Sequence, residues 1–171
     1  MKKLILVLLS TLTLISTSQA QGFIGIDIGS TKLTASNGWE DKSVIYGMKA
    51  GAQTENWRTY VGFNYFNSEL DQIEFYVSAD YIFTDETQLI RPFIGGSVGF
   101  ANTDDDKYDI DSSLTWGGQG GVLLNLDPHF NIEVGIKYMY FNMDSTVAYP
   151  YEYYNVFKDK LTLFVGANYK F

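Results

Sequence analysis

Cysteine is absent from this chain of 171 residues, and only one histidine is present. Without cysteine the protein has no disulfide framework, no acylated cysteine of a lipoprotein and no thiol nucleophile. The sequence also lacks the HExxH, phosphate-loop and dinucleotide motifs that place catalytic or cofactor-binding groups at fixed spacings. We therefore expect no catalytic residue, no cofactor, no metal centre and no enzyme activity.

Long apolar runs are nearly absent as well. Residues 1–20 hold one short run, which follows Lys2 and Lys3 and precedes Ser18-Gln19-Ala20, a small-x-small cleavage pattern. This predicts a signal peptide that is cleaved after Ala20. A membrane anchor is the alternative, but the run is shorter than the roughly 20 residues that a spanning helix needs. Residues 21–171 contain no apolar run of about 18 residues, so we expect one domain without a membrane helix.

Basic residues are also few. The chain has 12 lysines and arginines against 20 acidic residues, a net charge of −8, which becomes −10 when Lys2 and Lys3 leave with the signal peptide. This acidic balance argues against a nucleic-acid or heparin partner, which would need basic patches. Aromatic residues, in contrast, are abundant, with 13 Tyr, 12 Phe and 3 Trp, and such a composition favours β-strands.

Eight segments show the period-two alternation of a strand with one apolar and one polar face. They lie near residues 22–30, 43–52, 58–66, 73–83, 89–100, 114–124, 130–140 and 161–171. Nine charged residues fall within these segments, and all are on the polar face: Asp27, Lys49, Arg58, Glu74, Asp80, Arg91, Glu133, Lys137 and Lys170. This consistency predicts an all-β protein whose strands separate an apolar surface from a polar one.

The last of these segments ends in Gly166-Ala167-Asn168-Tyr169-Lys170-Phe171. This ending resembles the C-terminal signal of bacterial outer-membrane β-barrels, which alternates apolar residues, has an aromatic residue two before the end and terminates in Phe. The resemblance implies that the barrel-assembly machinery reads Gly166, Tyr169 and Phe171. Residues 91–100 and 126–132 are similar to a mid-barrel strand and a periplasmic turn of the OmpA/OmpX-like family of small outer-membrane β-barrels.

The resemblance to that family implies an eight-stranded, antiparallel, up-and-down transmembrane β-barrel over residues 21–171. It also implies a location in the outer membrane of a Gram-negative bacterium, in contact with lipid and lipopolysaccharide. Three connections are short (53–57, 84–88 and 125–129), and the four between them are longer (31–42, 67–72, 101–113 and 141–160). With both ends in the periplasm, all short turns are periplasmic and all longer loops extracellular, as is typical of outer-membrane barrels. We expect a monomer.

The polar face is expected to line the lumen of the barrel. Aromatic residues flank the apolar face near the strand ends, which favours contact with lipid. Eight strands leave a lumen filled by side chains, and glycines on the polar face would make room for the large ones. We predict a salt-bridged lumen network in which Asp27, Glu74, Asp80 and Glu133 pair with Lys49, Arg58, Arg91 and Lys137. A proton or small-ion path along the network is the alternative.

Two extracellular loops carry candidate binding residues. Tyrosine gives large and rigid contact area, so Tyr149, Tyr151, Tyr153 and Tyr154 would form a recognition surface for a host protein, a phage or a neighbouring cell. The alternative is a Tyr-rich extension of the strand hairpin. The acidic loop from Asp104 to Asp111 lacks the Gly and Glu of a calcium-binding EF-hand, so we interpret it as solvated. We interpret His129 as a residue of a periplasmic turn.

The expected function is a structural and adhesin-like role in the outer membrane, carried by the extracellular loops around a plugged lumen. A narrow porin for small solutes or ions is the main alternative. A soluble lipocalin-like binding barrel is a lesser alternative, because its apolar face would have to point inward.

Overall fold

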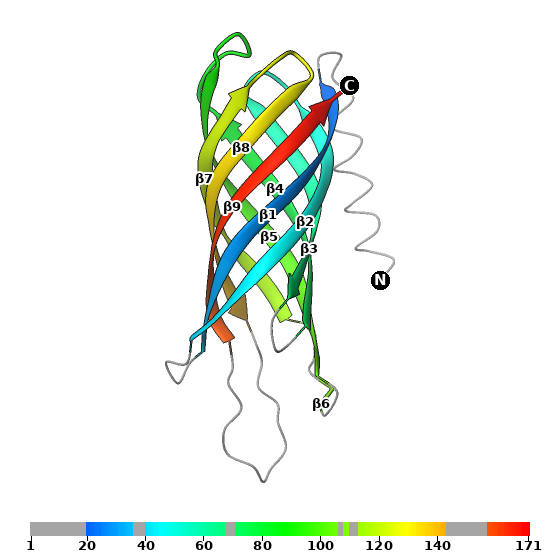
Figure 1. Cartoon of the computed structure of the whole chain (residues 1–171), viewed down its shortest axis with the longest axis vertical. Helices are drawn as coiled ribbons and strands as arrows, with labels where there is room; N and C mark the ends of the chain where they lie inside the picture. The colour runs from blue at the N-terminus through cyan, green and yellow to red at the C-terminus, as the bar shows by residue number, and fades with distance from the viewer. Residues whose placement is uncertain (1–19, 36–39, 68–70, 106–107, 110–112, 143–156) are drawn as a thin grey trace.

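The computed structural model describes residues 20–35, 40–67, 71–105, 108–109, 113–142 and 157–171. These residues form eight long strands and one strand of two residues (Figure 1): β1 (Gln21–Ala35), β2 (Glu40–Gln53), β3 (Trp57–Asn67), β4 (Asp71–Ile82), β5 (Ile90–Asp105), β6 (Tyr108–Asp109), β7 (Ser113–Asn125), β8 (Phe130–Asn142) and β9 (Phe157–Lys170). Among the described residues, no helix is long and apolar enough to cross a membrane.

The long strands form one closed antiparallel sheet. Each pairs with the next long strand along the chain, and β1 pairs with β9 to close the barrel. The short β6 pairs only with the end of β5. Because the sheet closes on itself, it has no open edge at which backbone N–H and C=O groups lack partners. The predicted eight-stranded up-and-down barrel is confirmed.

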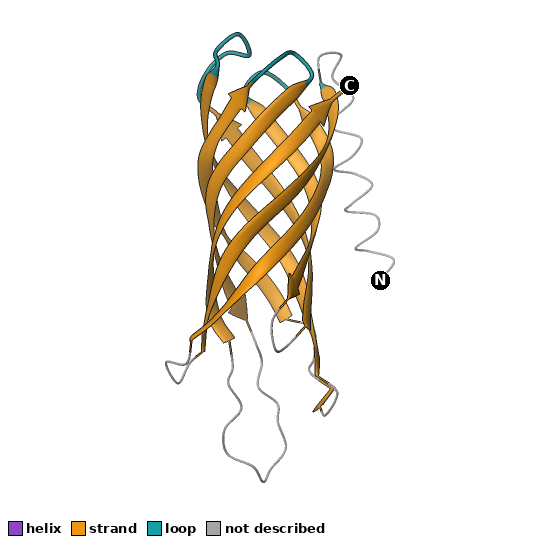
Figure 2. Cartoon of the chain, viewed as in Figure 1, coloured by secondary structure: helices purple, strands orange, loops and turns teal. Residues whose placement is uncertain are grey.

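The described turns between strands lie together at one end of the barrel, beside the C-terminus (Figure 2). They are residues 54–56, 83–89 and 126–129, and we call this end the turn end. The opposite end, where β1 and β2 approach each other along the chain, is called the loop end. The grouping matches the alternation of short and longer connections in the sequence.

At the loop end the strands are longer than the sequence pattern indicates. β1 runs to Ala35 and β2 begins at Glu40, so most of the connection expected over 31–42 is strand. The apolar outer face ends before this region, which removes the alternation that marks a strand. Backbone pairing nevertheless continues, and an ion pair of 2.6 Å joins Lys32 Nζ to Glu40 Oε1 across the two strands.

The two faces of the barrel wall have opposite polarity. On the outer face Ile26 is 63% exposed and Leu163 is 59% exposed, whereas Glu74, Asp80 and Glu133 on the inner face are 0% exposed. All nine charged residues predicted on the polar face are inside the barrel. An apolar exterior around a charged interior is the reverse of a soluble protein and is typical of a barrel surrounded by lipid.

Inner-face glycines lie where the wall is too crowded for a side chain. A Cβ on Gly117 would overlap the carbonyl oxygen of Tyr138, whereas a Cβ on the outward-facing Gly118 would be 3.6 Å from its nearest atom. We expect Gly117→Ala to lower the free energy of unfolding by about 1–3 kcal/mol, because the backbone must shift. Gly118→Ala should change it little. Urea titration of both variants in lipid vesicles measures the difference, and equal effects would contradict the assigned faces.

Candidate functional site in the charged interior

Eight charged side chains fill the middle of the barrel, and we call them the lumen network. Four are acidic and four are basic: Asp27, Glu74, Asp80 and Glu133, with Lys49, Arg58, Lys137 and Lys160. The side chain of Asp27 is 6% exposed, and each of the other residues is at most 5% exposed. Their formal charges cancel. Because an unpaired buried charge is costly, the stability of the barrel depends on how these groups are paired.

Glu133 on β8 is the centre of the larger part of the network. Its Oε2 accepts hydrogen bonds from Lys49 Nζ at 2.8 Å and Arg58 Nη1 at 2.7 Å, and its Oε1 accepts from Arg58 Nη2 at 3.0 Å. Arg58 also donates to Asp80 Oδ2 through Nε at 2.9 Å and Nη2 at 2.6 Å. Lys49 donates to Asp27 at 2.9 Å. Five strands are thereby joined across the lumen by charge-assisted hydrogen bonds.

Glu74 on β4 is the centre of a smaller part, nearer the loop end. Its carboxylate accepts hydrogen bonds from Lys160 Nζ at 2.8 Å, Asn64 Nδ2 at 2.9 Å and Thr115 Oγ1 at 3.3 Å. The carboxylate is therefore held by one ammonium and two neutral donors from three other strands. These contacts tie β4 to β3, β7 and β9.

Lys160 is the member of the network that the sequence analysis missed. The sequence pattern places it in the connection 141–160, but β9 begins at Phe157 and the side chain of Lys160 points into the lumen. The alternation of the last strand, extended back from Thr162, puts Lys160 on the inner face. One positive charge thus moves from the outer loops into the lumen.

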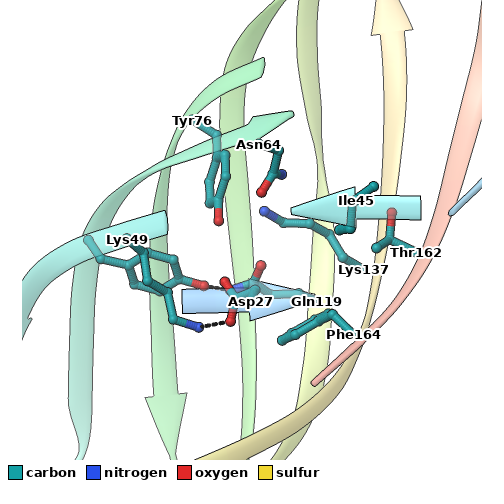
Figure 3. Close-up of a pocket in the computed structure, with 10 residues that line it drawn as sticks. Asp27, Ile45, Lys49, Asn64, Tyr76, Gln119, Lys137, Thr162 and Phe164 are labelled. Carbon is teal, nitrogen blue, oxygen red and sulfur yellow. Dashed lines mark hydrogen bonds and ion pairs between the residues drawn. The ribbon is translucent and has the colours of Figure 1, made fainter. Parts of the chain in front are cut away.

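Lys137 on β8 is buried without a carboxylate partner. Its ammonium lies 3.3 Å from the ring centroid of Tyr76, and no described Asp or Glu is within ion-pair distance of it. The predicted pairing of Lys137 with an acidic residue is therefore wrong. Lys137 also lines a cavity of about 20 Å³ together with Lys49 and Asn64 (Figure 3). This volume is sufficient for about one water molecule.

Lys49 and Lys137 offer a matched pair of buried lysines. Replacing Lys49 by Met leaves Asp27 and part of Glu133 without a partner, so we expect a loss of about 3 kcal/mol or more in the free energy of unfolding. Replacing Lys137 by Met removes a cation–π contact, worth about 2 kcal/mol or less. Urea unfolding of both variants in vesicles tests this order. Equal losses would mean that total charge, rather than pairing, governs stability.

Arg91 lies outside the network, contrary to the sequence prediction. Its guanidinium donates to the backbone carbonyl of Thr84 through Nε at 3.2 Å and Nη2 at 3.0 Å, and Nη2 also donates to the carbonyl of Glu55. Arg91 is near the start of β5, close to these turns, so its guanidinium reaches the carbonyl oxygens of the turns. Arg91 thereby joins two turns at the turn end instead of pairing with a carboxylate.

The residues of the C-terminal signal lie on both faces of the last strand. Tyr169 and Phe171 face outward at the turn end, whereas a Cβ on Gly166 would overlap the carboxylate of Asp27 inside. His129 fixes this end of the strand. Its carbonyl accepts the N–H of Lys170 at 2.6 Å, its Nδ1 lies 3.0 Å from the Lys170 carbonyl oxygen, and its ring stacks on Tyr169.

The candidate loop residues cannot be placed in this arrangement. Tyr149, Tyr151, Tyr153 and Tyr154 lie outside the described residues, and so do the side chains of the acidic loop 104–111. Within the described ranges, no group of three or more His, Asp or Glu side chains is placed to hold a metal ion.

No protein-family model matches the chain, and no curated protein is significantly similar to it. Solved structures are similar in fold. The crystal structure of Neisserial surface protein A (NspA) has a TM-score of 0.66 and 20% identity, covering 90% of this chain and 100% of that one. The solution structure of OprH from Pseudomonas aeruginosa has a TM-score of 0.62 and 23% identity, covering 88% and 99%. The fold is that of the small outer-membrane β-barrels.

A third barrel of this fold was solved with a bound ligand. It is Ail, the attachment invasion locus protein of Yersinia pestis, in complex with the heparin analogue sucrose octasulfate. Its TM-score is 0.53 at 17% identity, and the match covers 90% of this chain and 99% of that one. A shared fold does not by itself assign a role to this chain.

Proposed function

We propose that this protein is an integral outer-membrane β-barrel with its turn end in the periplasm and its loop end outside the cell. The observation that carries the proposal is the polarity of the wall, with apolar side chains exposed outside and a charge-balanced network buried inside. A soluble lipocalin-like barrel would need the opposite arrangement. Expressed with residues 1–20 in a Gram-negative host, the protein should be recovered in the outer membrane. Recovery as a soluble periplasmic protein would refute the proposal.

The lumen is proposed to be closed to solutes. Ile82, Phe93, Leu123 and Phe164 form an apolar cluster toward the turn end, and Leu33, Ala101 and Phe141 form another toward the loop end. The lumen network contacts both clusters, because Arg58 lies 4.9 Å from the ring centroid of Phe93 and Lys160 lies 5.5 Å from that of Phe141. An ion would have to pass both apolar clusters and displace paired charges. The narrow-porin alternative rests on Lys137, which lines the water-sized cavity without a described carboxylate partner.

The role of the protein is then proposed to be structural, with recognition by its extracellular loops and no enzyme activity. The Tyr-rich segment 149–157 is the candidate contact surface. Replacing it with a Gly/Ser linker of equal length should abolish binding to the target cell or phage and leave the folded barrel intact. Replacing 36–39 in the same way is the matched control. Unchanged binding in the 149–157 variant would refute the proposed recognition role.

The negative charge of the loop end limits which partners can bind there. Five acidic residues lie between positions 101 and 113, and Lys107 is the only basic residue there. A polyanion such as the heparin analogue bound by Ail would be repelled by this loop, so we propose a neutral or cationic partner. Lipopolysaccharide phosphates would instead meet Lys32 and Lys42, which lie directly opposite each other on β1 and β2.

The C-terminal strand is proposed to be the segment that the barrel-assembly machinery recognises, through Gly166, Tyr169 and Phe171. The outward exposure of the two aromatic side chains supports this, because they remain accessible on the barrel surface. His129, which binds the backbone of Lys170 and stacks on Tyr169, would hold the strand in place once the barrel has closed.

A further inference from the structure

The turn end of the barrel contains a pocket of about 370 Å³, which we call the mouth pocket. Its lining includes Glu86, Asn125, Asp127 and Lys170. Its volume is within the range of small-molecule sites, roughly 300–1,000 Å³. The lining brings together two carboxylates and one ammonium from two turns and the end of β9. Its location on the periplasmic side rests on the proposed function.

One side of the mouth pocket offers fixed hydrogen-bond acceptors. Asn125 Nδ2 donates to the carbonyls of Glu86 at 2.9 Å and Gln88 at 3.3 Å, which fixes the orientation of the amide. Asn125 Oδ1 is buried and accepts no hydrogen bond from the described residues. Asp127 Oδ1 accepts two backbone N–H groups of its own turn, at 2.7 and 2.9 Å, which fixes its carboxylate. These oxygens suit a bound ammonium group.

The other side offers donors without acceptors. Lys170 is 3% exposed and has no described carboxylate within ion-pair distance. Arg91 Nη1 and Gln53 Nε2 are buried without a hydrogen-bond partner among the described residues. Of these three residues, Lys170 at the end of β9 lines the mouth pocket, whereas Arg91 and Gln53 are not among its lining residues.

We propose that the mouth pocket binds a small zwitterion, a free α-amino acid. Its carboxylate would be held by the donor Lys170, and its ammonium by the acceptors Glu86, Asp127 and Asn125. A simple anion would be repelled by the two carboxylates, and a simple amine by Lys170. A molecule with both charges a few ångströms apart satisfies both sides of the pocket.

Isothermal titration of the folded full-length protein in detergent micelles tests this site, with glycine and alanine as probes and acetate and methylamine as controls. We expect the amino acids to bind at least about tenfold more tightly than either control. Glu86→Gln and Lys170→Met should each weaken glycine binding about tenfold. The exposed Lys42 lies at the opposite end, so Lys42→Met should leave glycine binding unchanged. If Lys170→Met does not fold, Glu86→Gln decides the test.

The proposal is overturned if glycine does not bind at about 50 mM. It is also overturned if acetate binds as tightly as glycine, or if the folded variants bind glycine like the unchanged protein. None of these results affects the outer-membrane location, which is tested separately by fractionation. Conversely, recovery as a soluble protein would refute the proposed outer-membrane location, whereas a positive titration would still support amino-acid binding in the mouth pocket.

Discussion

Replacing Glu133 by Ala should lower the free energy of unfolding by about 3–5 kcal/mol. Glu133 is fully buried and accepts hydrogen bonds from Lys49 and Arg58. Removing its carboxylate leaves the lumen network with four basic and three acidic groups, so one buried positive charge has no compensating carboxylate. Urea unfolding in lipid vesicles, followed by tryptophan fluorescence, measures the change.

Two controls separate lost charge from lost packing. Glu133→Gln keeps the size of the side chain and one acceptor oxygen but removes the negative charge, so its cost should lie between zero and that of Glu133→Ala. Lys32→Met breaks the half-exposed pair with Glu40, which should cost about 1 kcal/mol or less. If Glu133→Ala costs no more than Lys32→Met, the buried network does not stabilise the barrel.

Replacing Val134 by Arg should impair membrane insertion strongly. Val134 lies on the outer face of β8 between Ile132 and Ile136 and is 47% exposed there. If this face contacts lipid, an Arg near the middle of the bilayer costs roughly 2–4 kcal/mol. We expect a lower yield of the heat-modifiable folded form in vesicles and a smaller free energy of unfolding in the protein that does fold.

The matched control is Leu126→Arg in the turn 126–129. Leu126 is 56% exposed, similar to Val134, but it lies at the turn end of the barrel, where an Arg can reach water. We expect the cost at the bilayer interface to be about 0–1 kcal/mol. Normal insertion of Val134→Arg, or equal loss in both variants, would count against a lipid-facing outer wall.

Strand positions and faces were predictable because both depend on local alternation. Asp27, Glu133 and the other predicted charges are all on the inner face, since a period of two sets the face of each residue once its strand is located. Lys160 is not predicted as a lumen residue because the alternating segment is assigned from Leu161, whereas β9 begins at Phe157. The strand extensions at the loop end were missed for a related reason, since their outer residues are polar.

The pairings within the lumen were not predictable from local sequence. Lys49 and Glu133 are 84 residues apart, and Lys160 and Glu74 are 86 apart. Which side chains meet across the lumen depends on the stagger of the strands around the closed sheet, and alternation carries no information on stagger. Side-chain length matters too, because Arg91 is near the start of β5 and reaches turn carbonyls instead of a carboxylate.

Single-channel recording of the folded protein in a planar bilayer tests the central claim most directly, that the barrel crosses the membrane around a closed lumen. Heat-modifiable migration of the same sample shows that the barrel is folded. We predict folded, inserted protein that produces no conductance steps, because two apolar clusters and paired charges fill the lumen. Steady and reproducible conductance steps would contradict the closed lumen and would favour a narrow pore past Lys137.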